Sequence, residues 1–220
     1  MSAIKHVVIT AAGIGSRLGM NIPKCLVPVA NKCIIDYQLA LLEDIEDVRI
    51  VVGFMREEVI LHVKKIRPDA IFVCNHQYAT TTTLQSLFLG VKRLKEAVLI
   101  IDGDVIPEAV SFKNFLQYCK HHTAPLTTIC RAATSDAVYA VADPTDDQNI
   151  LNIMQFRRHP ATPFEWPGIS FIQPETIKNE KTFIYQRLEH QLPLPAYIIK
   201  CWEVDTPEDL LRVNREANDD

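Results

Sequence analysis

Hydrophobic residues fall into short, uninterrupted runs separated by longer stretches in which apolar positions recur with helical spacing. The runs lie at 6–10, 48–54, 70–74, 97–102 and 125–130, and the first four are rich in Val and Ile. The first four are continuous rather than alternating, which is typical of strands buried on both faces of a parallel sheet. Amphipathic stretches of helical length lie between them, at 35–45, 56–66 and 83–94. This alternation predicts α/β layers with helices on both faces of a sheet.

The pattern becomes less regular after residue 125. Segments 137–141 and 150–156 flank an Asp/Pro-rich turn, which predicts a hairpin. The remaining predicted elements are a strand at 168–172, a helix over 174–192, a last strand at 196–205 and a last helix over 206–218. Thr206 and Pro207 are favoured residues for the N-cap and first position of that helix.

Composition excludes several classes of protein. The 220 residues are 48% hydrophobic and 23% charged, as in an ordinary globular domain. The net charge of −4 gives no overall attraction to nucleic acid or to an anionic membrane, so we expect neither as a partner. No apolar run reaches the roughly 18–20 residues of a membrane helix. The N-terminus lacks the pattern of a signal peptide, and the six cysteines include no C-x-x-C pair. We therefore expect a cytoplasmic protein with reduced cysteines; its oligomeric state, a homodimer included, is left open.

A glycine-containing loop, ITAAGIGSRLG, follows the first predicted strand. It places Gly13 and Gly15 where backbone N–H groups can bind phosphate oxygens. A dinucleotide fingerprint needs a third glycine earlier than Gly19 and an acid about 20 residues later, and a P-loop needs G-K-[ST]. Both patterns are missing. The glycines alone leave a purely structural turn as an equal alternative.

Two cations, Arg17 and Lys24, accompany this loop. Cations beside a ring of backbone donors suit a triphosphate, whose terminal phosphates must be held when pyrophosphate leaves. The alternative is a pair of solvated surface cations, which contribute little. Their placement against glycines and the rigid Pro23 favours the triphosphate.

The segments AAGIGSRLG and PKCLVPVANKCIIDYQL resemble the signature of nucleotidyltransferases that activate phosphorylated small molecules with a nucleoside triphosphate. This family includes sugar-1-phosphate nucleotidylyltransferases, bacterial phosphocholine cytidylyltransferases and MobA-like NTP transferases. The resemblance implies a three-layer αβα Rossmann-like fold with a mixed, mostly parallel sheet. It also implies one domain over 1–220, whose less regular acceptor-binding part lies around 132–196. The nucleotide-binding positions that it implies are Ala11, Ala12, Gly13, Gly15, Ser16, Arg17 and Lys24. Thr10 departs from the family, which more often has leucine there.

Acidic residues follow a buried strand in LIIDGDVIP. Asp102 and Asp104 would emerge at the carboxyl edge of the sheet, where open α/β folds bind ligands. An Asx turn is the structural alternative, but two acids in one turn favour a divalent cation that neutralises a triphosphate. The resemblance implies a Mg²⁺ ion held by Asp104 and Asp205, with Asp102 assisting at the nucleotide. Without the resemblance, a structural role for Asp205 at a helix start is the favoured interpretation.

The segment NHQYATTTTLQSL resembles a stretch of the cytidylyltransferase-like members. This implies that Thr81, Thr82 and Ser86 face the base or ribose, whereas helix capping alone is the structural alternative. FEWPGISFI resembles the strand that lines the acceptor pocket in the family, which implies acceptor contacts from Glu165, Trp166 and Gly168; Trp166 fits a core position equally well. A basic cluster at 157–159 either meets the acceptor's phosphate or belongs to a solvated loop.

We therefore expect an enzyme in which a phosphate oxygen of a small phosphorylated acceptor attacks the α-phosphorus of a nucleoside triphosphate and releases pyrophosphate. Arg17, Lys24 and Asp104 would carry the catalysis, mainly through charge and positioning. The YATTTTLQSL segment and the compact length favour CTP and a phosphocholine-like acceptor, with a sugar 1-phosphate as the alternative. A hypothesis of another class is a catalytically silent nucleotide-sensing domain, but such a domain has no need of two cations and two acids.

Overall fold

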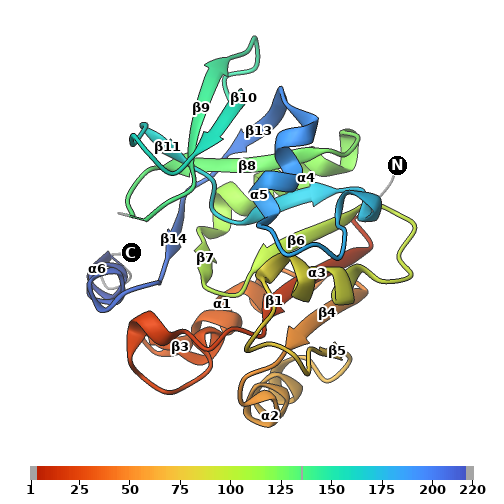
Figure 1. Cartoon of the computed structure of the whole chain (residues 1–220), viewed down its shortest axis with the longest axis vertical. Coiled ribbons are helices and arrows are strands. Elements are labelled where there is room, and N and C mark those ends of the chain that lie inside the picture. Colours follow the sequence, from red (N-terminus) through yellow and green to blue (C-terminus); the bar gives the residue numbers. More distant parts are fainter. Residues whose placement is uncertain (1–3, 135, 217–220) are drawn as a thin grey trace.

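The computed structural model describes residues 4–134 and 136–216 (Figure 1). Ten strands form one sheet in the order β11-β9-β10-β13-β8-β12-β6-β1-β4-β5, and helices cover both of its faces. Two short ribbons, β2–β3 and β7–β14, lie outside this sheet. The predicted αβα layers and mixed sheet are confirmed. Contrary to expectation, the sheet is not mostly parallel, because its C-terminal strands pair mainly antiparallel. In the described part of the chain, no helix is both long and apolar enough to cross a membrane.

The parallel half of the sheet is built from the N-terminal part of the chain. Its strands are β1 (His6–Ala11), β4 (Asp47–Val52), β5 (Ile71–Cys74) and β6 (Val98–Asp102). The helices that connect them are α1 (Ile34–Ala40), α2 (Arg56–Ile66) and α3 (Thr83–Val91). The prediction of burial on both faces is wrong for β5, where Ile71 is 47% exposed, because β5 is the last strand of the sheet. The carboxyl ends of β1 and β6 lie side by side, with Thr10 opposite Asp102.

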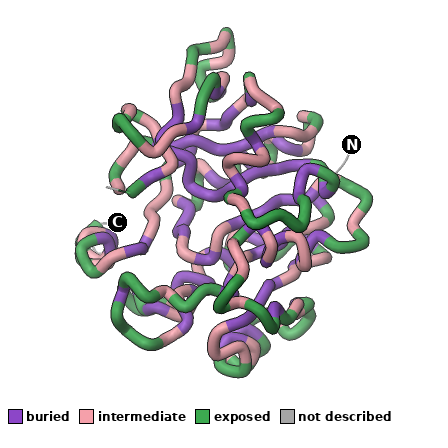
Figure 2. Tube along the Cα trace, in the orientation of Figure 1, coloured by how far each residue is buried: buried purple, intermediate pink, exposed green. Residues whose placement is uncertain are grey.

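Alternating side chains of the central strands supply two separate cores. Val7 and Ile9 of β1 pack in the core that contains α1, α2 and α4 (Ala109–His121). Val8 packs in the opposite core with α3 and α5 (Ile184–Leu188). Figure 2 shows the resulting buried layer through the middle of the molecule. A strand with apolar residues on both faces is thereby held between two helical layers.

The other half is built from the C-terminal part of the chain, and its strand pairs are antiparallel except for β8 and β13, which run parallel. Its strands are β8 (Leu126–Arg131), β9 (Tyr139–Pro144), β10 (Ile150–Arg157), β11 (Phe164–Glu165), β12 (Ile169–Ile172) and β13 (Leu194–Ile198). The predicted hairpin is confirmed as the β9–β10 pair, and the strand at 168–172 as β12, which runs antiparallel to β6. This half therefore extends the sheet beyond β6.

Two predictions for the C-terminal part are wrong. The helix over 174–192 is divided into η3 (Pro174–Thr176), α5 and η4 (Glu189–Gln191), since residues 178–182 offer no apolar side chain to a buried face. The strand at 196–205 is divided into β13 in the large sheet and β14 (Cys201–Glu203), which pairs with β7 (Val105–Pro107). The last helix is α6 (Pro207–Glu216); the rest of the predicted range lies outside the described residues.

Candidate active site

The glycine loop leaves β1 at its carboxyl end and turns into η1 (Ser16–Leu18). Gly15 has φ 64°, a conformation that favours glycine, and a Cβ there would lie 3.2 Å from Lys24 Cβ. Lys24 begins η2 (Lys24–Leu26), which is followed by β2 (Pro28–Val29) and β3 (Lys32–Cys33). The loop and Lys24 are therefore packed against each other, as the sequence predicts.

Two cavities adjoin at the carboxyl edge of the parallel strands. The first measures about 140 Å³, and the predicted residues in its lining are Ala11, Ala12, Gly13, Lys24, Thr81, Thr82, Ser86, Asp102 and Asp104. The second measures about 200 Å³, and the predicted residues in its lining are Arg17, Asp102, Asp104, Trp166, Gly168 and Asp205. Asp102, Asp104 and Thr83 border both cavities. Gly15 and Ser16 belong to the neighbouring loop and to neither lining.

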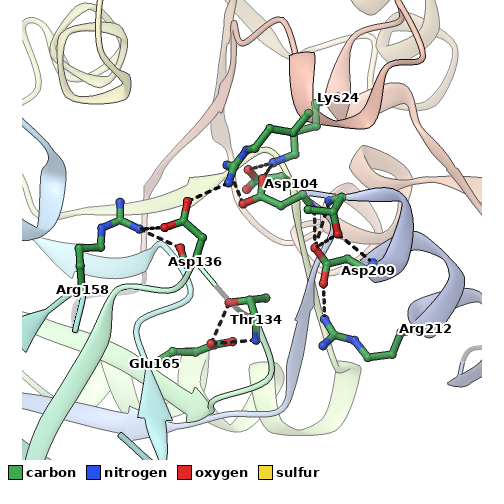
Figure 3. Close-up of polar contacts among 11 residues, drawn as sticks. Lys24, Asp104, Thr134, Asp136, Arg158, Glu165, Asp209 and Arg212 are labelled. Atoms are coloured by element: carbon green, nitrogen blue, oxygen red, sulfur yellow. Dashed lines mark hydrogen bonds and ion pairs between the residues drawn. The ribbon is translucent and has the colours of Figure 1, made fainter. Parts of the chain in front are cut away.

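A chain of ion pairs runs along the wall between the cavities (Figure 3). Lys24 Nζ contacts Asp104 Oδ2 at 2.5 Å and also pairs with Asp205 Oδ1. Arg17 Nη2 contacts Asp205 Oδ2 at 2.7 Å, and its Nη1 contacts Asp136 Oδ2 at 3.1 Å. Segments far apart in the sequence thus bring the two predicted cations and the two predicted metal ligands together.

Burial and charge act in opposite directions on these groups. Burial acts to lower the pKa of Lys24, but the carboxylates of Asp104 and Asp205 outweigh it and the net shift is upward. Burial likewise acts to raise the pKa of Asp205, but Lys24 and Arg17 outweigh it and the net shift is downward. Lys24 is therefore an ammonium and Asp205 a carboxylate at neutral pH.

Glu203 is a member of this acidic group that the sequence analysis missed. One carboxylate oxygen from each of Asp104, Glu203 and Asp205 lies within 4.8 Å of the others. Burial, with the charges of both aspartates, raises the pKa of Glu203 well above its usual range. Glu203 lies two residues before Asp205 at the end of β14, so the alternation of side chains along a strand was the available signal.

The acidic group fits a divalent cation such as Mg²⁺. Its donors are hard carboxylate oxygens from separate segments, the kind that this ion prefers. A cationic group, the Lys24 ammonium, already lies between Asp104 and Asp205, which shows that positive charge is stabilised at this point. Asp104, Asp205 and Glu203 are therefore the residues that would hold the ion.

Asp102 is held from two sides. Its Oδ1 accepts a hydrogen bond of 2.8 Å from Thr10 Oγ1, which gives a role to the residue that departs from the family pattern. Burial, with the charge of Asp104, raises the pKa of Asp102 to about 7. Gly168, at φ 75°, lies against it, since a Cβ there would be 2.5 Å from Asp102 Oδ2. Gly168 therefore provides the space that Asp102 occupies.

We expect Gly168→Ala to destabilise the fold by roughly 2–4 kcal/mol, because the methyl group collides with the Asp102 carboxyl and the residue is strained at positive φ. Gly19→Ala is the matched control, since Gly19 has φ 65° with nothing within 4 Å of its Cβ position. Denaturant unfolding of both variants separates the collision from the strain. Equal losses in the two variants would contradict the collision with Asp102.

The threonine segment lines the first cavity with hydroxyls that already have partners. Asn75 Nδ2 donates to Thr81 Oγ1 at 2.8 Å and to Ser86 Oγ at 2.9 Å. Thr82 is the N-cap of α3 and accepts from Gln85 N at 3.3 Å. Asn75, the first residue of the segment NHQYATTTTLQSL, was given no role by the sequence analysis, and it fixes the wall of this cavity.

The structure does not place Glu165 where an acceptor contact was expected, because this residue lines neither cavity. Its buried carboxylate accepts three hydrogen bonds, from Ala133 N, Thr134 N and Thr134 Oγ1, at 2.9–3.3 Å (Figure 3). Arg212 of α6 donates to Ala133 O at 2.5 Å from the other side. Glu165 thus holds Ala133 and Thr134 in place instead of contacting the cavity.

The far wall of the second cavity is aromatic. Trp166 is 7% exposed, and its Nε1 donates to Thr127 Oγ1 at 2.9 Å, so it belongs to the core as well as to the cavity. Phe183 and Tyr185 stack with centroids 5.9 Å apart, and the Arg158 guanidinium lies 5.9 and 5.6 Å from their centroids. Of the basic cluster at 157–159, only Arg158 is part of this lining.

Comparison with known proteins connects this site to one family. The family model described as the MobA-like NTP transferase domain matches residues 7–149, about two thirds of the chain. The chain belongs to this family. Relatives that share this similarity carry the names of nucleotidyltransferases.

Individual relatives differ in the nucleotide that their names specify. A putative mannose-1-phosphate guanyltransferase of Sulfolobus acidocaldarius is 23% identical over 95% of this chain and 62% of the relative. The choline-phosphate cytidylyltransferase of Streptococcus pneumoniae is 35% identical over 44% of this chain and 43% of the relative. The chain therefore spans less than two thirds of either relative. An apo UDP-glucose pyrophosphorylase structure superposes with a TM-score of 0.80 and 16% identity over 98% of both chains, which shows a shared fold.

Proposed function

We propose that the protein transfers a nucleoside monophosphate from its triphosphate to a small phosphomonoester and releases pyrophosphate. The observation that carries this proposal is the position of Lys24, Arg17 and the aspartates on the wall between two cavities. The cavity beside the glycine loop would take the nucleotide, and the aromatic cavity would take the acceptor. The nucleotide and the acceptor would then react beside Asp104, which borders both cavities.

The residues of this wall account for the chemistry through charge and position. Backbone amides of residues 11–16 would hold the base and phosphates. Lys24 and Arg17 would exchange their carboxylate partners for phosphate oxygens and stabilise the negative charge of the leaving pyrophosphate. Mg²⁺ bound at Asp104 and Asp205 would neutralise triphosphate charge. The acceptor phosphate is already an anionic nucleophile, so no general base is required.

We propose CTP as the nucleotide. Support comes from the threonine segment, which lines the first cavity, and from the similarity to the pneumococcal choline-phosphate cytidylyltransferase. A nucleotidyltransferase of the sugar-phosphate and cytidylyltransferase kind is supported whichever base is used.

We also propose a cytoplasmic location. It fits the six free cysteines, since disulfides are rare in that compartment.

The acceptor is either phosphocholine-like or a sugar 1-phosphate, and the aromatic wall favours the sugar 1-phosphate. A phosphocholine-like acceptor needs an aromatic face for its quaternary ammonium group. Here the Arg158 guanidinium lies over both Phe183 and Tyr185, and it is tied to Asp136 by a 2.8 Å hydrogen bond to the backbone oxygen. A cation therefore already occupies these rings. An acceptor rich in hydroxyl oxygens, such as a sugar 1-phosphate, would instead accept hydrogen bonds from this guanidinium.

We expect Arg158→Ala to lower kcat/KM for a sugar 1-phosphate about 10-fold or more through KM, because hydrogen bonds to a charged group contribute about 1.5–3 kcal/mol. Phosphocholine use should be unchanged or improved, since the rings become accessible. Initial rates with both acceptors measure this. Arg157→Ala, outside the cavity lining, is the matched control. Equal losses of kcat/KM with the sugar 1-phosphate and with phosphocholine would contradict the role of Arg158 in choosing between them.

Pyrophosphate release tests the proposal as a whole. The protein is incubated with Mg²⁺, each of the four nucleoside triphosphates and a panel of phosphomonoesters. Turnover should appear with one nucleotide and depend on the acceptor. Measurable nucleotide binding without release in any combination would favour a catalytically silent nucleotide sensor.

A further inference from the structure

A second group of metal-ligating side chains lies in the described residues outside the active site. One atom each from Cys33, Asp36 and His62 lies within 4.8 Å of the other two. We propose that these residues form a binding site for a zinc-like divalent metal ion, with one coordination position open to water. The ion would join the start of α1 to α2, since Cys33 and Asp36 belong to α1 and its cap and His62 to α2.

The ligands are oriented before any ion binds. Asp36 Oδ2 accepts a hydrogen bond of 2.8 Å from Cys33 N, which leaves Oδ1 directed at His62. His62 Nε2 lies 2.6 Å from that Oδ1. Protein metal sites commonly hold a ligating carboxylate by a hydrogen bond to its other oxygen. The backbone contact at Oδ2 has this arrangement.

The distance between His62 and Asp36 must increase slightly for an ion to bind between them. Two ligands about 2.0 Å from a tetrahedral ion lie about 3.3 Å apart, so His62 must move away from Asp36 by about 0.7 Å. Their side chains are 28% and 17% exposed, respectively, so an ion has access and His62 has room to move. The group is thus near binding geometry without being buried.

The donor set indicates the kind of metal. Sulfur, imidazole nitrogen and carboxylate oxygen together are ligands of zinc, whereas magnesium prefers oxygen alone. The all-carboxylate group of the active site has the opposite preference. A thiol binds the ion only after losing its proton, so binding should strengthen as the pH rises.

The site is connected to the active site through α1. Gln38, two residues after Asp36 in α1, donates from Nε2 to Asp102 O at 2.8 Å and to Val105 O at 2.7 Å. These bonds hold the turn that contains Asp104. An ion that ties α1 to α2 would therefore also brace this turn, and binding should raise the melting temperature of the whole chain.

Cobalt titration of the full chain tests the proposal. The metal-stripped protein is titrated with Co²⁺ in excess Mg²⁺, which occupies the carboxylates of the active site. We expect one equivalent of Co²⁺ to produce a thiolate-to-cobalt charge-transfer band and intense visible bands of a tetrahedral site, and one equivalent of Zn²⁺ to remove them. Absence of the charge-transfer band in the folded protein would overturn the proposal.

Three variants assign the ligands. Cys33→Ser should abolish the charge-transfer band, and serine is a favoured N-cap, so α1 is retained. His62→Gln should weaken Co²⁺ binding at least about 10-fold. Cys201→Ser, a half-buried cysteine elsewhere, is the control and should leave the band unchanged. A band that survives in Cys33→Ser, full affinity in His62→Gln, or a band lost in Cys201→Ser would each contradict the site, with circular dichroism confirming that each variant is folded.

Discussion

Lys24→Met is expected to lower kcat by about 100- to 1,000-fold, the usual cost of removing one preorganised group that stabilises transition-state charge. Methionine retains most of the length of the side chain, so the packing against Gly15 is kept. The variant should also lose much more affinity for the triphosphate than for the monophosphate, because the ammonium is assigned to the leaving pyrophosphate. Initial rates and calorimetric titration of both nucleotides measure these effects.

Lys24→Met should also change the stability of the protein. Without the ammonium, the carboxylates of Asp104 and Asp205 face each other unneutralised. We therefore expect a lower melting temperature that Mg²⁺ restores more strongly than in the wild type. Lys32→Met, at an exposed position of β3, is the control. Equal losses of triphosphate and monophosphate affinity would contradict the assignment of Lys24.

Asp104→Asn is expected to reduce turnover about 1,000-fold or more and to abolish the dependence of the rate on Mg²⁺ concentration, because an amide is a poor ligand for that ion. Asp205→Asn should have a similar effect and also releases Arg17 from its 2.7 Å ion pair. The fold should be retained, since both residues lie at strand or helix ends. Rates across a Mg²⁺ titration measure this.

Asp136→Asn is the matched control for these variants. Asp136 belongs to the same chain of ion pairs through Arg17 and Arg158, but it is outside the group whose oxygens lie within 4.8 Å of one another. We expect it to retain Mg²⁺ dependence with a smaller loss of rate. Turnover above about a tenth of wild type in Asp104→Asn would contradict the metal role, because the ion supplies several kcal/mol of charge stabilisation.

The parallel half of the fold was predictable because its signal is local. A run such as residues 97–101 is apolar throughout, and that pattern identifies a doubly buried strand without reference to any partner. The division of 196–205 was not predictable in this way. Its two strands join different sheets, and the choice depends on β7 and β8, which are far away in the sequence.

The site was predictable where one short segment carries several of its features. The glycine loop and the Asp102–Asp104 turn are both of this kind, and the structure places them side by side. Asp136 was missed because it acts through Arg17, which is far away in the sequence. Asn75 and Glu203 lie in or beside segments that the sequence did single out, but only the structure shows which atoms they contact. Glu165 was misplaced for a related reason. A carboxylate on a strand gives no sign in the sequence of whether it faces a cavity or, as here, the backbone of a loop.

The most direct test of the central claim follows the oxygen atoms of the acceptor. A phosphomonoester that carries heavy oxygen in its phosphate group is incubated with the protein, Mg²⁺ and the nucleoside triphosphate that supports turnover, and the products are analysed by mass spectrometry. Attack of the acceptor phosphate on the α-phosphorus predicts that all of the label stays in the nucleotidyl product and that the pyrophosphate carries none. Label in the released phosphate species, or a nucleoside diphosphate as product, would contradict nucleotidyl transfer.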